Sequence, residues 1–199
     1  MLSEIGGFFL AMTLGFGGVQ VLSSLWGIFL NTQVTKNARK GVIASEAKQS
    51  GNYRVDREAI EKRCGTRLLR FARNDDKYCK LGRVATYFQG GFLLAAFFTL
   101  MTAFYLCDFS ILTVALHDHK ALPWFYRLAA TWGNHEGSLL LFVLILSGMG
   151  VGLATFLKDP RFRARALTIQ GLLTLSFLIF LMMTSNPFTP LPFTLSEGV

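Results

Sequence analysis

The amino-acid sequence predicts an all-α fold, a polytopic transmembrane helical bundle with four spans. The first observation is a set of long apolar stretches separated by charged connectors, at residues 5–30, 84–107, 137–157 and 166–184. Each stretch has about the 20 residues that a helix needs to cross a hydrocarbon core about 30 Å thick. The second observation is the composition, 52% hydrophobic and 16% charged, which is not that of a water-soluble domain. In lipid, helices also satisfy their own backbone polar groups.

Charge is distributed unevenly along the chain. Residues 36–83 hold 14 of the 20 Lys and Arg residues but only 6 of the 12 Asp and Glu residues. Such a segment could attract nucleic acid. Between two spans it more simply marks the cytoplasmic side, because basic residues near helix ends resist translocation. We therefore predict a basic cytoplasmic loop at 36–83 and no nucleic-acid partner.

The other connectors give a consistent topology. Residues 158–165 are again basic, and they fall on the side of the first loop only if there are four spans. The 108–136 connector is mildly acidic and is predicted to be external. Its charged residues are Asp108, Asp118, Lys120, Arg127 and Glu136. Both termini are then predicted to be non-cytoplasmic.

Three segments follow from this topology. Residues 1–35 form the first transmembrane helix, 36–83 the basic cytoplasmic loop, and 84–199 a three-span region with the external loop 108–136. A cleaved signal peptide is the competing interpretation of the first stretch. It is disfavoured because there is no positively charged start and no small-residue cleavage site after Trp26.

All three histidines lie in or next to the external loop. His117 and His119 flank Asp118, and His135 lies near the start of the third span. A neutral imidazole can ligate a metal or haem iron. Residues two apart lie on different faces of a helix, so the His-Asp-His triplet is better explained as polar surface.

The cysteines predict no metal site. Cys64, Cys79 and Cys107 form no CxxC pair, which argues against a zinc ribbon and a thioredoxin-like motif. The chain also has no CxxCH signature of covalent haem attachment.

Aromatic and titratable residues gather where the chain approaches the third span. Residues 122–126 read Leu-Pro-Trp-Phe-Tyr, a group typical of the boundary between lipid and water. Trp132, His135 and Glu136 follow at the point of re-entry into the membrane. They are candidate functional residues, although a carboxylate at a helix start also has a structural explanation in the helix dipole.

Residues 132–140, Trp-Gly-Asn-His-Glu-Gly-Ser-Leu-Leu, form the most specific motif of the chain. Together with Tyr126, the 184–188 segment Thr-Ser-Asn-Pro-Phe and the opening stretch with Gln20 and Trp26, this motif resembles the N-terminal part of the System I cytochrome c maturation haem lyases, the CcmF type. The resemblance covers nearly everything except the basic insert.

The resemblance implies a function in cytochrome c-type biogenesis at the bacterial inner membrane. Family members take haem from a periplasmic haem chaperone and assist its covalent attachment to apocytochrome c, which a partner subunit presents. The resemblance therefore implies haem as cofactor, with the haem-binding residues expected beyond this chain, and leaves the catalytic residues unidentified. His135 matches the histidine of the family motif. The candidate cofactor-binding residues in this chain are Trp132, Glu136, His117, His119 and His135.

The sequence departs from the family pattern at two places, and both affect what we expect this chain to do. Residues 37–77 resemble a translated palindromic repeat inserted in frame, and a surface loop tolerates such an insertion because closure entropy grows only logarithmically with length. Within it, residues 56–73 could form a basic helix on anionic lipid. The chain also ends where the family continues. We expect a truncated or split subunit, completed by a second chain or inactive, and not catalytic alone.

Two other classes of protein remain as alternatives. A small membrane transporter or channel subunit could use the external histidines, but transport paths place ionisable groups within the spans. These four stretches have no charged residue or histidine at mid-depth. An interaction protein acting through the basic loop is the other alternative, and deletion of residues 37–77 separates it from a haem lyase.

Overall fold

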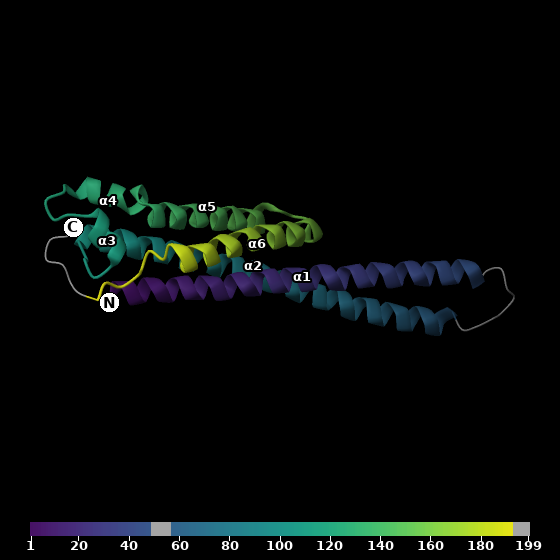
Figure 1. The fold of residues 1–199 in the computed structure, drawn as a ribbon. Helices are drawn as coiled ribbons and strands as arrows, with labels where there is room; N and C mark the ends of the chain where they lie inside the picture. Colours follow the sequence, from purple (N-terminus) through teal and green to yellow (C-terminus); the bar gives the residue numbers. More distant parts are fainter. Residues whose placement is uncertain (49–56, 193–199) are drawn as a thin grey trace.

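The computed structural model describes residues 1–48 and 57–192, and in these residues it contains six helices and no strand. From α2 onward the helices follow one another along the chain with short connections (Figure 1). They are α1 Leu2–Lys48, α2 Arg57–Leu106, α3 Leu112–His117, α4 Trp124–Gly133, α5 His135–Phe156 and α6 Pro160–Thr184. Some residues within α1, α2 and α6 are described by their backbone alone.

The prediction of four membrane spans is confirmed. Four helical segments are long and apolar enough to cross a bilayer, at Leu2–Phe29, Lys80–Leu106, His135–Phe156 and Phe162–Thr184. Each begins two to four residues before the predicted apolar stretch. Hydropathy locates the part of a helix that crosses the membrane, whereas the helix itself begins in the polar residues that precede it.

The spans form a ring of four helices. α1 packs against α2 and α6, and α5 packs against the same two helices from the other side. Met1, α3, α4 and residues 185–192 gather at one end of this ring, which we call the termini end (Figure 1). The structure thus places the predicted external loop 108–136 at the same end as the N-terminus.

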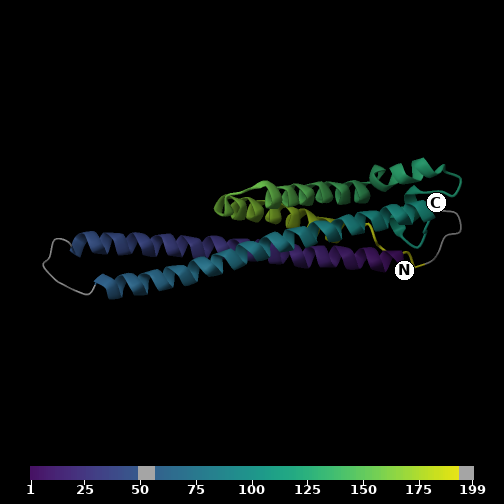
Figure 2. The ribbon, with the colours of Figure 1, turned by 180° about the vertical axis from the view of Figure 1, so that it is seen from behind.

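The connector between the first two spans is mostly helical. α1 continues to Lys48 and α2 begins at Arg57, so the segment that the sequence analysis treats as a loop consists largely of two helical extensions. The extensions run past the turn between α5 and α6 as a projecting hairpin (Figures 1 and 2). At 1.5 Å per residue, the part of α1 beyond its span is roughly 28 Å long. The predicted helix at 56–73 falls in α2, except for Asp56, which lies outside the described residues.

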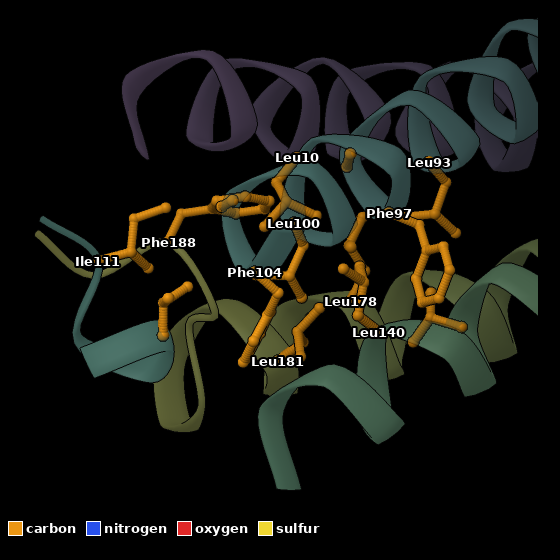
Figure 3. Packing of buried hydrophobic residues seen from close by; sticks show 14 of the residues in the cluster. Leu10, Leu93, Phe97, Leu100, Phe104, Ile111, Leu140, Leu178, Leu181 and Phe188 are labelled. Atoms are coloured by element: carbon orange, nitrogen blue, oxygen red, sulfur yellow. The ribbon is translucent and has the colours of Figure 1, made fainter. Parts of the chain in front are cut away.

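A single apolar core fills the half of the ring nearest the termini end (Figure 3). Side chains from α1, α2, α5 and α6 meet there, together with two residues of α3 and three from the irregular segments. The labelled members are Leu10, Leu93, Phe97, Leu100, Phe104, Ile111, Leu140, Leu178, Leu181 and Phe188. Because Phe188 and Ile111 belong to segments outside the spans, this core also fixes the chain beyond the membrane.

The outward faces of the spans are apolar as well. Large exposed side chains such as Ile145, Phe180 and Met183 belong to α5 and α6 and lie within the spans. Exposed apolar surface of this extent is what lipid contact requires. The chain is therefore a multi-pass helical membrane protein.

Candidate functional site

The turn from α4 into α5 is built by Asn134. Its side-chain Oδ1 accepts a hydrogen bond from the backbone nitrogen of Gly137 at 2.6 Å, which caps α5. Its Nδ2 donates to the carbonyl oxygen of Ala130 at 2.8 Å, one turn back in α4. An asparagine that bonds both helices fixes the angle between them, and its burial protects the two bonds from water.

Gly137 lies against the backbone of α4. A Cβ atom at this position would overlap the carbonyl oxygen of Thr131, so any side chain here would force the two helices apart. By contrast, a Cβ atom at Gly133 would meet no other atom within 4 Å. The asparagine and the second glycine of the Trp-Gly-Asn-His-Glu-Gly motif are thus explained by the geometry of the turn.

His135 begins α5 and is bound to the end of α6. Its Nδ1 lies 3.2 Å from the Oγ of Ser185, a hydrogen bond in which either atom can donate. Ser185 is buried, whereas the imidazole is exposed. This bond brings together two segments of the family-like sequence that are 50 positions apart, and it leaves Nε2 as the ring nitrogen available to a ligand.

The segment after Ser185 is fastened at the termini end. Asn186 accepts a hydrogen bond from the backbone nitrogen of Phe188 at 3.1 Å. Further along, the nitrogen of Leu191 donates to the carbonyl oxygen of Ser110 at 2.8 Å, and the nitrogen of Leu112 donates to that of Thr189 at 2.9 Å. The segment 185–192 therefore links α6 to the chain between α2 and α3 and holds Ser185 in place beneath His135.

Within the described part of the chain, no side-chain hydrogen bond or ion pair joins the other candidate residues to His135. Trp132 is 45% exposed on α4, and Glu136 lies in the first turn of α5, where its charge suits the helix dipole. His117 bonds the carbonyl oxygen of Thr113 within α3 through its Nδ1, at 3.0 Å. His119 accepts from the backbone nitrogen of Ala121 through its Nδ1, at 3.2 Å. Both histidines are used to shape the local backbone.

No group of three or more His, Cys, Asp or Glu residues that could hold a metal ion occurs among the residues that the structure describes. His117 and His119 flank Asp118, but the aspartate side chain is turned into the protein, with an exposed fraction of 0%. Asp118 follows the last residue of α3 in an extended conformation, with φ −128° and ψ 152°, and its carboxylate lies inside while its two neighbours stay exposed. The triplet presents two imidazoles to solvent and one carboxylate to the interior.

Asp118 is a residue whose role the sequence analysis missed. Its Oδ1 accepts a hydrogen bond from the backbone nitrogen of His119 at 2.9 Å and lies 3.9 Å from the Nε of Arg127. Arg127 also donates to the carbonyl oxygen of Lys120. Asp118 and Arg127 thus stabilise the loop between α3 and α4 by contacts on its buried side.

Cys107 lies beside this pair, just after α2, and adopts a positive φ of 53°. Partial burial raises the pKa of its thiol, and the neighbouring Asp118 carboxylate raises this pKa further, through its negative charge and a hydrogen bond. A thiol in this environment is held in its protonated, unreactive form. Cys107 therefore has a packing role here.

A second feature that the sequence analysis did not predict lies within the membrane. Gln20 of α1 donates from Nε2 to the carbonyl oxygen of Leu167 at 3.1 Å and to Oε1 of Gln170 at 2.9 Å. Gln170 of α6 donates in turn to the carbonyl oxygen of Leu146 in α5 at 2.9 Å. These amides, which we call the glutamine cluster, connect three of the four spans by hydrogen bonds.

Close helix contacts surround the glutamine cluster. A Cβ atom at Gly150 would overlap the amide of Gln170, and one at Gly171 would lie 2.9 Å from the Nε2 of Gln20. Gln89 of α2 is also fully buried near these residues, but neither of its amide atoms has a hydrogen-bond partner within the described residues. The signal in the sequence is a glutamine in each of three apolar stretches, which a search for charged residues passes over.

Comparisons with known proteins agree with the motif. No protein-family model matches the chain. The cytochrome c-type biogenesis protein CcmF of Pseudomonas aeruginosa is 43% identical over 129 residues, which are 63% of this chain and 20% of that protein. CcmF of Escherichia coli is 40% identical over 120 residues, 59% of this chain and 18% of that protein. The biogenesis protein ccl1 of Rhodobacter capsulatus is 44% identical over 102 residues, 50% of this chain and 16% of that protein.

A solved structure shows the same fold. The cytochrome c heme lyase CcmF superposes with a TM-score of 0.64 at 17% sequence identity, over 94% of this chain and 25% of that structure. This chain spans about a fifth of the length of the curated relatives that it matches. In its aligned part the chain is similar to CcmF proteins, and its fold matches that of the cytochrome c heme lyase CcmF.

Proposed function

We propose that this chain serves in cytochrome c-type biogenesis as part of a membrane haem lyase. The observation that carries the proposal is the identity of 40–44% with CcmF proteins over about three fifths of the chain, together with a fold match to the heme lyase CcmF. The contact between His135 and Ser185 supports it, because this contact joins the two segments that the sequence analysis singles out.

In this proposal the protein lies in the bacterial inner membrane with the termini end facing the periplasm. Its partners are a haem chaperone, apocytochrome c and the subunit that presents it, and the remaining part of a CcmF-type lyase. The basic hairpin then lies on the cytoplasmic side, as expected from the charge distribution along the sequence.

The described residues do not by themselves fit a haem group. Haem in a membrane bundle needs an axial ligand and an apolar slot that excludes water. His117 and His119 are exposed and bound to nearby backbone, and the buried polar groups between the described parts of the spans are uncharged amides and hydroxyls. The ring of His135 is bonded through Nδ1 to the Oγ of Ser185, as a supporting contact would fix a ligand, but the described residues place no apolar slot around it. The described residues therefore take no chemical step of haem attachment in this proposal.

The role that fits is structural and positional. The rigid α4–α5 turn and the fastened 185–192 segment present Trp132, His135 and Glu136 at the termini end. Substrate handling by the rest of the lyase would take place next to this platform. His135 is the residue we expect to matter most there, because it is exposed and its ring is bonded to a residue of another segment, Ser185, and not to nearby backbone as in His117 and His119.

The test is covalent haem on c-type cytochromes in cells whose own copy of this gene is deleted. Haem bound through thioether bonds survives denaturing gels, so its stain reports attachment directly. We expect loss of stained cytochromes c with unchanged b-type haem, restored by the wild-type gene. His135→Ala should restore less than the matched variant His117→Ala. Unchanged staining in the deletion strain would refute the proposal, whereas equal rescue by both variants would refute only the assignment to His135.

A further inference from the structure

The hydroxyl group of Ser185 is turned away from its own helix. Many serine and threonine hydroxyls of the spans donate to the backbone carbonyl oxygen four residues earlier, as Thr174 does at 3.0 Å and Ser176 at 2.8 Å. Ser185 directly follows α6, and its backbone nitrogen donates to the carbonyl oxygen of Leu181 at 3.0 Å. Its hydroxyl group does not bond that carbonyl. Among the described residues the partner of the hydroxyl is Nδ1 of His135, at 3.2 Å.

The direction of this hydrogen bond follows from the donors and acceptors present. A serine hydroxyl has one hydrogen to donate, and a neutral imidazole has one nitrogen that donates and one that accepts. Ser185 is buried, with an exposed fraction of 8%, so a hydroxyl hydrogen without an acceptor would be costly. Because Nδ1 of His135 is the one acceptor that this hydroxyl bonds among the described residues, Ser185 donates and Nδ1 accepts. The proton of the neutral ring then lies on Nε2.

The second ring nitrogen of His135 is therefore a donor. The residue is exposed, while its Nδ1 is bonded to the buried Ser185. An imidazole binds iron or zinc through the lone pair of a nitrogen, which an N–H group does not offer. A hydrogen bond from Nε2 to an oxygen atom also needs no apolar slot, and the described residues place none around this ring.

The other two histidines allow a comparison by the same rules. Nδ1 of His117 lies 3.0 Å from the carbonyl oxygen of Thr113, which can only accept, so Nδ1 of this ring carries the proton. Nδ1 of His119 accepts from the backbone nitrogen of Ala121 at 3.2 Å, so the neutral ring has its proton on Nε2. We therefore expect His119 and His135 in one tautomer and His117 in the other.

We propose that Ser185 is a positioning residue that fixes His135 in the Nε2–H tautomer, and that His135 binds its ligand by donating a hydrogen bond to an oxygen atom and not by ligating iron. Supporting contacts of this kind determine which ring nitrogen of a histidine faces a ligand. The acceptor is a carbonyl or carboxylate oxygen, the class of atom that an N–H group binds. The inference rests on the proposed function only for the molecule that carries this oxygen.

The first experiment measures the tautomers directly. The full chain has three histidines, so isotope labelling of histidine alone gives three imidazole signals in an NMR spectrum. In lipid nanodiscs at mildly alkaline pH, where imidazoles are neutral, nitrogen chemical shifts distinguish a protonated ring nitrogen from an unprotonated one. We expect the proton on Nε2 in His135 and His119 and on Nδ1 in His117, with His117→Ala and His119→Ala as assignments. A proton on Nδ1 of His135 would overturn the proposal.

Substitution of Ser185 tests whether this residue sets the tautomer. Ser185→Ala should let the Nδ1–H form of His135 appear, because a ring without this partner exchanges between both forms, and Ser185→Thr, which retains the hydroxyl, should suppress it again. The matched control is Ser138→Ala, since that hydroxyl donates to the carbonyl oxygen of His135 at 3.0 Å and not to its ring. Unchanged signals of His117 report an intact fold. A His135 spectrum unaltered by Ser185→Ala would refute the role of Ser185.

Two substitutions of His135 separate a hydrogen-bond donor from an iron ligand. His135→Gln retains an N–H group but offers no imidazole lone pair, whereas His135→Met offers a thioether that can ligate haem iron but donates no hydrogen bond. In the deletion strain we expect the Gln variant to restore several times more covalent haem staining than the Met variant. Equal staining, or more staining with Met, would refute the donor role.

These measurements separate failure of this inference from failure of the proposed function. The tautomer of His135 is measured on the chain itself and does not depend on any cytochrome c. Full staining in the deletion strain would refute the haem-lyase assignment, while the NMR spectrum would still decide the role of Ser185. Lost staining in that strain with equal rescue by the Gln and Met variants would instead refute only the ligand chemistry assigned to His135.

Discussion

Gly137 shows how a single residue fixes the geometry of the candidate site. Its missing side chain lets α5 begin directly against the carbonyl oxygen of Thr131. We predict that Gly137→Ala destabilises the protein by several kcal/mol, on the order of an overpacked core substitution or more, because backbone must move. Gly133→Ala is the control, since its added methyl group would meet no atom within 4 Å. Thermal unfolding in mild detergent measures both, and equal midpoints would contradict the structure.

Cys107 gives a prediction in pH. Partial burial and the Asp118 carboxylate both raise the pKa of its thiol, so the thiolate appears only at higher pH than for an ordinary cysteine. With Cys64 and Cys79 changed to Ser, maleimide should label Cys107 more slowly than a free thiol at mildly alkaline pH. Asp118→Asn removes the negative charge, lowers the pKa and should speed labelling. Slower labelling of that variant would show that the carboxylate does not act on the thiol.

The sequence identifies the candidate residues of the site, but it predicts the structural role of only some of them. The Trp-Gly-Asn-His-Glu-Gly motif stood out by resemblance, and the helix dipole gave a reason for Glu136. The bond from His135 to Ser185 joins residues 50 positions apart, and local pattern carries no information about such a pairing. The burial of Asp118 was equally hidden, because a count of charges treats every carboxylate as solvated.

Packing between the membrane helices depends on uncharged polar residues. Gln20 joins α1 to α6 through two hydrogen bonds, whereas Gln89 on α2 is fully buried and neither of its amide atoms has a partner among the described residues. We predict that Gln20→Met costs about 1–3 kcal/mol, because it leaves buried acceptors without a donor. Gln89→Met should leave stability unchanged or raise it, since it removes two unsatisfied atoms.

Denaturation in mixed micelles measures both variants. Ser176→Ala is the control, because among the described residues its hydroxyl bonds the carbonyl oxygen of Leu172 within the same helix. An equal loss for Gln89→Met and Gln20→Met would mean that Gln89 has a partner, such as a bound water molecule. The predicted difference between the two variants makes the comparison informative even if absolute stabilities differ between detergents.

The helices themselves were predicted from length and hydropathy, because lipid imposes both. What the sequence analysis missed was their continuation into charged segments, as in α1 beyond Phe29 and α2 before Lys80. Charged residues in the sequence mark the point at which a helix leaves the membrane, but the helix itself can continue beyond that point. The short helices α3 and α4 were also not predicted, since their few turns are determined by packing at the termini end.

The projecting hairpin should be dispensable for the bundle as a whole. Deletion of residues 37–77 leaves all four spans and the apolar core intact, so we predict a thermal midpoint within a few degrees of the wild-type chain. Leu140→Ala, which opens a cavity in the core, should instead cost about 2–5 kcal/mol. A deletion variant that unfolds as readily as Leu140→Ala would show that the hairpin holds the bundle together.

The central claim, that this chain works as part of a haem lyase, is tested most directly by purifying it through an affinity tag from membranes in mild detergent. Co-purifying proteins are identified by mass spectrometry, and the reduced absorption spectrum of the same sample reports haem. We predict a polytopic CcmF-type partner together with stoichiometric haem. A folded chain recovered alone and without haem would contradict the claim.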